Sequence, residues 1–202
     1  MKGTTLTEQM RSLQDRFETR RLADRVLQVA FHDKLTEKDR AMIDDAMFFF
    51  LATVDGAGQP QCSYKGGPRG FVTIEDDATI VFPIYEGNGL YISAGNMAEM
   101  GKVGLLFIDF EAQRRMRING VAEIVEDHPA YRSVRAAQLS IRVRITDIHP
   151  NCPRNVHKMQ LVEQSSYSPQ CEADDVGKAP WGDSFADVLP DSMKPEHMKQ
   201  SK

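Results

Sequence analysis

The segment from Tyr85 to Asn96 reads YEGNGLYISAGN and places three glycines, two asparagines and one serine between two apolar segments. Glycine allows backbone N–H groups to approach a ligand closely. The residues SAGNMAEMGK are typical of a short helix, and the start of a helix offers unpaired N–H donors and roughly half a positive charge. The segment therefore predicts an anion site, for which a phosphate is the expected ligand.

The familiar nucleotide-binding motifs do not explain this segment. No GxGxxG follows a strand in an alternating strand–helix context, and no GxxxxGK followed by Ser or Thr occurs anywhere. The sequence therefore supports neither a dinucleotide fold nor a P-loop in its usual form.

Two further segments could present polar groups to the same ligand. In CSYKGGPRG, an extended strand places Ser63 and Lys65 on one side and Tyr64 on the other. In RRMRING, Arg115 and Arg117 share a strand face, and two guanidinium groups there need carboxylates, water or a phosphate as partners. Both segments indicate cations on neighbouring strands.

The elements that must position these residues are mostly strands. Two hairpins are predicted in FFFLATVDGAGQPQCSY and GFVTIEDDATIVFPI, followed by a buried strand in KVGLLFIDF. RRMRINGVAEIV predicts a long strand with a bulge at Asn119-Gly120, and SIRVRITDI alternates strictly. About six strands without strand–helix alternation favour a mainly β fold, a small antiparallel barrel with peripheral helices.

Helices are expected before the barrel. Residues 7–30 contain no Gly or Pro and carry an apolar stripe, which predicts one long amphipathic helix, and Thr36 and Asp39 indicate the capped start of another. We expect a helical arm at residues 1–45, able to lie across a partner subunit, a barrel at 46–160 and a tail at 161–202 with little regular structure.

The order of these motifs resembles the pyridoxamine 5'-phosphate oxidase-like family of FMN-binding split barrels. The resemblance rests on FFFLATVDGAGQPQCSYKGG, FVTIEDDATIVFPIYEGNGLYISAGN, KVGLLFIDF and RRMRINGVAEI, over roughly residues 45 to 158, and NCPRNVHK resembles a subgroup of the family. It implies a six-stranded antiparallel split barrel that forms a homodimer. It also implies FMN in clefts at the dimer interface, where the glycines would clear space for the flavin.

The resemblance also implies cofactor-binding positions. Residues 63 to 65 would run along the flavin, Phe82 and Pro83 would lie beside its ring, residues 93 to 96 would lie near the phosphate, and Arg115 would contact the flavin. Arg117 is added from the alternation of its strand. The complete expected set is Ser63, Tyr64, Lys65, Phe82, Pro83, Tyr85, Asn88, Gly89, Ser93, Asn96, Arg115 and Arg117.

The chain departs from this family at two places. The Ser-Arg-Lys phosphate grip of pyridoxamine phosphate oxidases is replaced by Tyr91-Ile92-Ser93 or Ser93-Ala94-Gly95, which lack both cations. The Arg-Leu-His segment that receives the vitamer is also missing, and Pro180-Trp181-Gly182 resembles only the part before it. These departures count against vitamin B6 oxidation, and the sequence leaves the substrate, the reductant and the choice between FMN and deazaflavin open.

The composition and net charge of the chain limit the kinds of protein it can be. With 202 residues, 41% hydrophobic residues and a net charge of -4, the chain is expected to form one soluble globular domain without nucleic-acid or membrane partners. The N-terminus lacks a signal-peptide pattern, so the cytoplasm is the expected compartment. The three cysteines have no CxxC spacing, which favours reduced thiols.

Rival sites remain as alternatives. His149, Cys152 and His157 match no standard zinc pattern, and nothing identifies an orienting group for Cys152 as a nucleophile. The resemblance implies an FMN-dependent oxidoreductase of unknown substrate. A flavin- or haem-binding sensor, store or carrier without turnover is the main alternative, with His32, His149 or His157 as possible iron ligands. A structural dimer with an empty cleft is a third. Trp181 is interpreted either as packing against a partner's flavin or as anchoring the tail.

Overall fold

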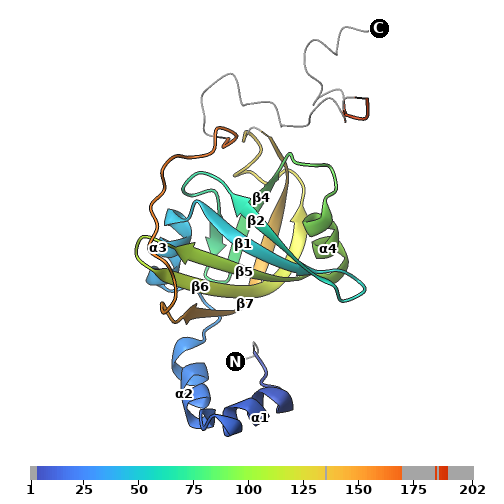
Figure 1. Cartoon of the computed structure of the whole chain (residues 1–202). Helices are drawn as coiled ribbons and strands as arrows, with labels where there is room; N and C mark the ends of the chain where they lie inside the picture. Colours follow the sequence, from blue (N-terminus) through green and yellow to red (C-terminus); the bar gives the residue numbers. More distant parts are fainter. Residues whose placement is uncertain (1–3, 135, 170–184, 186, 191–202) are drawn as a thin grey trace, which may run out of the picture. The chain divides into compact units, whose positions relative to one another are not determined.

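The computed structural model describes residues 4–134, 136–169, 185 and 187–190 (Figure 1). The chain divides into a compact unit of residues 1–162 and a second unit of residues 163–202. Trp181, whose role the sequence left open, lies outside the described residues, as does most of the expected tail.

Seven strands form one sheet in which every neighbouring pair is antiparallel. The strand order is β2-β1-β5-β6-β7-β4-β3, so β2 and β3 are the two edges. The strands are β1 (Phe48–Val54), β2 (Pro60–Gly66), β3 (Thr73–Asp76), β4 (Thr79–Tyr85), β5 (Lys102–Asp109), β6 (Arg114–Val125) and β7 (Ala137–Asn151). The mainly β antiparallel barrel is therefore confirmed, but the count of six is corrected to seven, with β3 the shortest strand.

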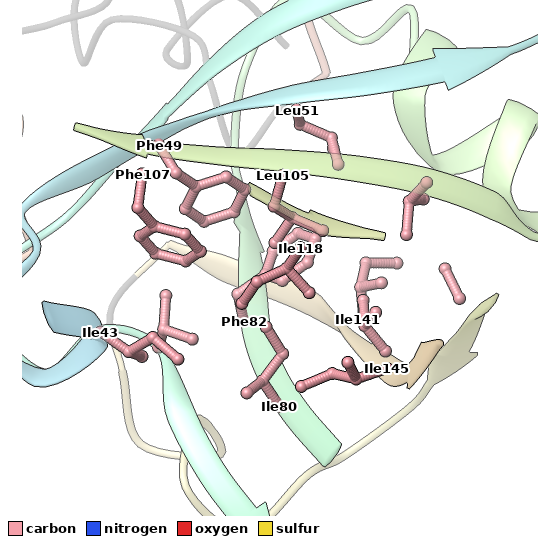
Figure 2. Packing of buried hydrophobic residues seen from close by; sticks show 14 of the residues in the cluster. Ile43, Phe49, Leu51, Ile80, Phe82, Leu105, Phe107, Ile118, Ile141 and Ile145 are labelled. Atoms are coloured by element: carbon pink, nitrogen blue, oxygen red, sulfur yellow. The ribbon is translucent and has the colours of Figure 1, made fainter. Parts of the chain in front are cut away.

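The core fills the inner side of this curved sheet (Figure 2). Phe49 and Leu51 of β1 point inward and are fully buried, whereas Phe48 and Phe50 point outward. Phe49 packs edge-on against Phe82 of β4, with ring centroids 5.0 Å apart, and lies 5.1 Å from the ring of Phe107. These rings join strands from both halves of the sheet, because β1 and β4 lie on opposite sides of β5, β6 and β7 in the strand order.

The bulge expected at Asn119-Gly120 is confirmed by a register shift between β6 and β7. A Cβ atom at Gly120 would lie 2.5 Å from Val143 Cγ1 and 2.7 Å from the Arg144 carbonyl oxygen. Only glycine allows this close approach of two backbones, so the bulge keeps the long β6 strand paired with β7 as the sheet curves.

The four helices of the described chain are α1 (Glu8–Arg16), α2 (Arg20–Ala30), α3 (Glu37–Asp45) and α4 (Ile92–Met100). The capping box predicted at Thr36 and Asp39 is present at the start of α3. The single long helix expected at residues 7–30 is wrong, because Glu18 adopts a φ of 55° and ends the first helix. Ion pairs of Arg11 with Asp24 and Arg20 with Asp15 hold the resulting pair together.

In the described part of the chain, none of the helices combines the length and the apolar character that a membrane crossing requires.

A polar cluster joins β3, β7 and the loop after β6. Glu75 accepts hydrogen bonds from Arg142 Nε and Nη2 at 2.7 and 2.9 Å and contacts His128 Nε2 at 3.0 Å. The hydrogen bonds from Arg142, together with His128, lower the pKa of Glu75 from 4.5 to about 2. The cluster therefore ties the short edge strand β3 to the centre of the sheet.

We predict that Glu75→Gln lowers the free energy of unfolding at pH 7 by about 1–2 kcal/mol, because a charged acceptor at a partly exposed site is lost. The folded-state pKa of Glu75 is depressed, so its contribution is present above pH 4.5 and is lost as the pH falls toward about 2. Urea unfolding between pH 3 and pH 7 should show the wild-type advantage shrinking in acid, whereas the exposed Glu163→Gln should show no such trend.

Candidate functional site

A pocket of about 260 Å³ lies between strand β2, the end of β4, the loop that follows and the start of α4. It combines backbone, hydroxyl, phenol and ammonium groups from segments that are far apart in the sequence. Its lining residues are Gln61, Cys62, Ser63, Lys65, Ile84, Tyr85, Gly87, Asn88, Tyr91, Ile92, Ser93 and Ala94. The pocket therefore joins the glycine-rich segment to the strand that carries Ser63 and Lys65.

Strand β2 contributes to the pocket because it lies at an edge of the sheet. It pairs with β1 alone, with Lys65 opposite Phe49 and Ser63 opposite Leu51. Because opposite residues of an antiparallel pair share a face, Ser63 and Lys65 lie on the side of the buried core residues. Its other edge leaves alternate backbone N–H and C=O groups unpaired by the sheet.

The start of α4 is fixed by two left-handed residues. Gly89 has a φ of 73° and Tyr91, the N-cap, has a φ of 50°. The Tyr91 hydroxyl donates to Gln138 Oε1 at 2.6 Å, and Ser93 Oγ lies 3.1 Å from Ser63 Oγ. The serine contact holds the first turn of α4 against β2, and the tyrosine bond ties its N-cap to β7. The N–H groups of that first turn have no acceptor within the helix.

The three glycines of this segment lie in largely open surroundings. Of Gly87, Gly89 and Gly95, only Gly89 adopts a positive φ. An added Cβ would meet nothing within 4 Å at Gly89 or Gly95 and only the Tyr85 carbonyl oxygen at 3.9 Å for Gly87. In the single chain, therefore, backbone conformation requires glycine at Gly89, and crowding requires it at none of the three positions.

Lys65 is the cation of the pocket. It is half-buried, and no carboxylate lies within 4 Å of its ammonium group in the part of the chain that the structure describes. Burial lowers its pKa, because a charged amine loses hydration there. A bound anion would restore that lost stabilisation, so the site is electrostatically suited to a phosphate or an anionic ring.

Tyr85, at the end of β4, also lines the pocket. Burial raises the pKa of its phenol to about 12. The hydroxyl therefore stays protonated at neutral pH and can donate a hydrogen bond to a ligand, but it cannot act as a general base there.

The structure brings together only part of the expected site set. Ser63, Lys65, Tyr85, Asn88 and Ser93 line the pocket. Tyr64 points to the outer face of the sheet, where its ring stacks on Phe48 with centroids 5.5 Å apart. Gly89 shapes the loop without lining the pocket.

Phe82, Pro83 and Asn96 have structural surroundings. Phe82 is fully buried in the core and Pro83 is buried beside it in β4, so the next residues, Ile84 and Tyr85, reach the pocket instead. Asn96 is buried and donates from Nδ2 to Thr53 Oγ1 at 3.1 Å. In a single chain these three residues do not reach the pocket.

Arg115 and Arg117 lie on β6, which is separated from β2 by β1 and β5. Arg115 Nε donates to the Cys152 carbonyl oxygen at 3.1 Å, and Arg117 lies opposite His149 of β7. The predicted pair of arginines thus shares one face, but neither arginine lines the pocket of the same chain.

Sequence reasoning did not select five of the lining residues, which are Gln61, Cys62, Ile84, Tyr91 and Ile92. The alternation that selected Ser63 and Lys65 extends to Gln61, so that residue was accessible to the same argument. Tyr91 gave no sequence signal, because its position depends on a left-handed backbone and on Gln138 of β7.

The three rival ligand candidates, His149, Cys152 and His157, differ in exposure. Among the residues that the structure describes, no group of three or more His, Cys, Asp or Glu side chains could hold a metal ion. His149 is buried, whereas Cys152 and His157 are exposed.

The barrel and the helix before it match a known protein family. The family model described as pyridoxamine 5'-phosphate oxidase matches residues 35–163. The chain belongs to the pyridoxamine 5'-phosphate oxidase family. The matched residues include α3, all seven strands and α4, and hence every residue that lines the pocket of this family member.

Several solved structures are similar to this member of the pyridoxamine 5'-phosphate oxidase family. A candidate pyridoxamine 5'-phosphate oxidase from Lactobacillus delbrueckii is 23% identical, with 58% of this chain and 94% of that chain covered and a TM-score of 0.48. HupZ from Group A Streptococcus is 21% identical, with 62% and 99% covered and a TM-score of 0.47. An FMN-binding protein from Syntrophomonas wolfei is 16% identical, with 71% and 97% covered and a TM-score of 0.43. No curated protein matches the chain significantly.

We predict that Thr53→Val lowers the free energy of unfolding by about 1–3 kcal/mol, because it leaves the buried Asn96 amide without its acceptor. The double variant Thr53→Val with Asn96→Leu removes both polar partners and should recover part of this loss. Equal destabilisation of the single and double variants in urea unfolding would contradict a structural role for the Asn96 bond.

Proposed function

We propose that this protein is an FMN-dependent oxidoreductase that binds FMN between two copies of the chain. The observation that carries the proposal is the half-buried, unpaired Lys65, which lines the same pocket as Ser63, Ser93 and the first turn of α4. Membership of the pyridoxamine 5'-phosphate oxidase family supports the choice of a flavin.

The pocket has the right chemistry for FMN but provides only part of the space. Its volume of about 260 Å³ lies below the roughly 300–1,000 Å³ that is typical of sites for ligands of this size. A second copy of the chain would complete the enclosure, which supports a homodimer with one site at each end of a symmetric interface.

The phosphate and the ring would use different groups. Positions 93 to 95 carry Ser, Ala and Gly and no cation, so the phosphate would be held by backbone N–H groups of α4 and by the hydroxyl of Ser93. The unpaired edge of β2 would offer backbone groups to the ring. The partner subunit's Arg115 and Arg117 are candidates for additional charge, because their own subunit places them away from its pocket.

Bound FMN would supply hydride or two-electron transfer at its ring. The protein would orient the flavin and tune its charge. Lys65 would stabilise negative charge on the flavin, and the Tyr85 phenol would donate a hydrogen bond without taking up a proton.

The first test is the absorption spectrum of the purified full chain together with its thermal unfolding in added FMN. We expect flavin bands and a rise in the unfolding temperature that saturates with FMN. A Soret band would replace this proposal with a haem-binding module, and the absence of both a chromophore and a thermal shift would favour a structural dimer.

We predict that Lys65→Met weakens FMN binding by about 10- to 100-fold, the loss expected for one hydrogen-bonded charge. Lys102→Met, at the exposed start of β5, is the matched control and should bind FMN like the wild type. Titration with riboflavin locates the charge. A loss for FMN alone places Lys65 at the phosphate, a loss for both places it at the ring, and no loss for either would contradict the proposed cleft.

A further inference from the structure

The N-terminal helices are attached to the barrel through a short stretch of β7. Neither α1 nor α2 contains a buried residue. Thr4 Oγ1 contacts Asp147 Oδ1 at 3.5 Å, the Phe31 ring stacks on the His149 ring, and His32 pairs with Ile148 through two backbone hydrogen bonds of 3.1 and 2.6 Å. All three contacts fall on Asp147, Ile148 and His149, which we call the anchor.

His149 is the central ring of this anchor. Its imidazole stacks on Phe31 with centroids 4.1 Å apart and an interplanar angle of 12°, and the residue is only 8% exposed. Its Nδ1 is buried and has no hydrogen-bond partner among the described residues. A buried imidazole in that position fits the contact best in the neutral form, because burial of a charge without hydrogen bonds is costly.

The nearest carboxylate does not satisfy His149. Asp147 Oδ1 lies 3.8 Å from His149 Nδ1, which is too far for a hydrogen bond. That oxygen already accepts from Asn119 Nδ2 at 3.0 Å, and Asp147 Oδ2 accepts from Thr146 Oγ1 at 3.3 Å. Asp147 is therefore held by other donors and attracts a proton on His149 only from a distance.

Positive charge faces His149 from the other elements packed against it. Arg117 lies directly opposite on β6, and His32 follows Phe31 in the segment after α2. His32 in turn contacts Asp39 of α3 at 2.8 Å, so that carboxylate is already engaged. Burial, Arg117 and His32 together lower the pKa of His149, against the opposite influence of Asp147.

We propose that the stacked Phe31–His149 pair is a pH-dependent latch, in which neutral His149 holds the N-terminal helices on β7 and protonated His149 releases them. The direction follows from linkage. Because the docked state disfavours the protonated ring, docking is fully stabilised above the ordinary histidine pKa of 6.5 and weakens as the pH falls below it. The latch does not depend on the proposed flavin function.

Release would have a defined structural consequence. It would uncover the polar outer surface formed by Asn119, Asp147 and His149. It would also let the α1–α2 segment carry its exposed apolar side chains to another surface. These side chains, Met10, Leu13, Phe17, Leu22, Val26 and Val29, are each more than 40% exposed in the docked state.

The test is hydrogen exchange of the full chain at pH 7.5 and pH 5.0, read as protection of the amides of His32 and Ile148. We expect protection of both to fall by about threefold or more in acid, since each unit between the docked and released pKa of His149 changes the docking equilibrium tenfold. Protection factors corrected for intrinsic exchange remove the direct effect of pH on the chemistry. Unchanged protection would overturn the proposal.

Three variants assign the effect to the stacked pair. His149→Phe keeps an aromatic ring against Phe31 but cannot be protonated, so the arm should stay protected at pH 5.0. Phe31→Ala should lower protection at both pH values. His32→Gln should retain the pH response of the wild type. A response that persists in His149→Phe, or that vanishes in His32→Gln, would show that His149 is not the switch.

Discussion

The open edge of strand β2 is the constraint on which the site depends. A seven-stranded sheet curls around one core, but the two terminal strands in its order, β2 and β3, do not pair with each other. Phe49, Phe82 and Phe107 hold both halves of the sheet around this core. Core packing therefore keeps the edge strands β2 and β3 unpaired. The ligand groups gather there because α4 and the end of β4 lie beside the unpaired edge.

The same open edge explains the electrostatics of the pocket. Lys65 lies on the inward face of β2, opposite the buried Phe49 of β1. Its ammonium group therefore loses water of hydration without gaining a carboxylate partner. A half-buried cation without a partner reduces stability, and proteins commonly carry such a cost at binding sites. Ser63 of β2 and Ser93 of α4 are hydrogen-bonded to each other, which fixes the distance between these two elements before any ligand binds.

The outer face of the sheet near β1 and β2 carries aromatic side chains. Aromatic rings of Phe48, Tyr64 and Phe110 stack along it, and Arg115 and Arg117 lie farther across on β6. An apolar sheet face of this kind is typical of an interaction surface, and the contacts of Thr4, Phe31 and His32 with the sheet fall on β7 instead. The proposed dimer would place a second copy against this face, bringing its arginines toward a pocket that they cannot reach in one subunit.

The sequence by itself determined the features that depend on neighbouring residues. Alternation placed Ser63 and Lys65 on one face, Asn119-Gly120 marked the bulge, and Thr36 with Asp39 marked the start of α3, because each of these follows from local backbone geometry. The break at Glu18 and the left-handed Tyr91 were not visible, since contacts such as Arg11 with Asp24 and Tyr91 with Gln138 stabilise them. Only the tertiary structure decided that β2 and α4 form the pocket together and that Arg115 and Arg117 lie outside it. The order of strands in a sheet is set by packing between residues far apart in the chain, which local sequence patterns do not reveal.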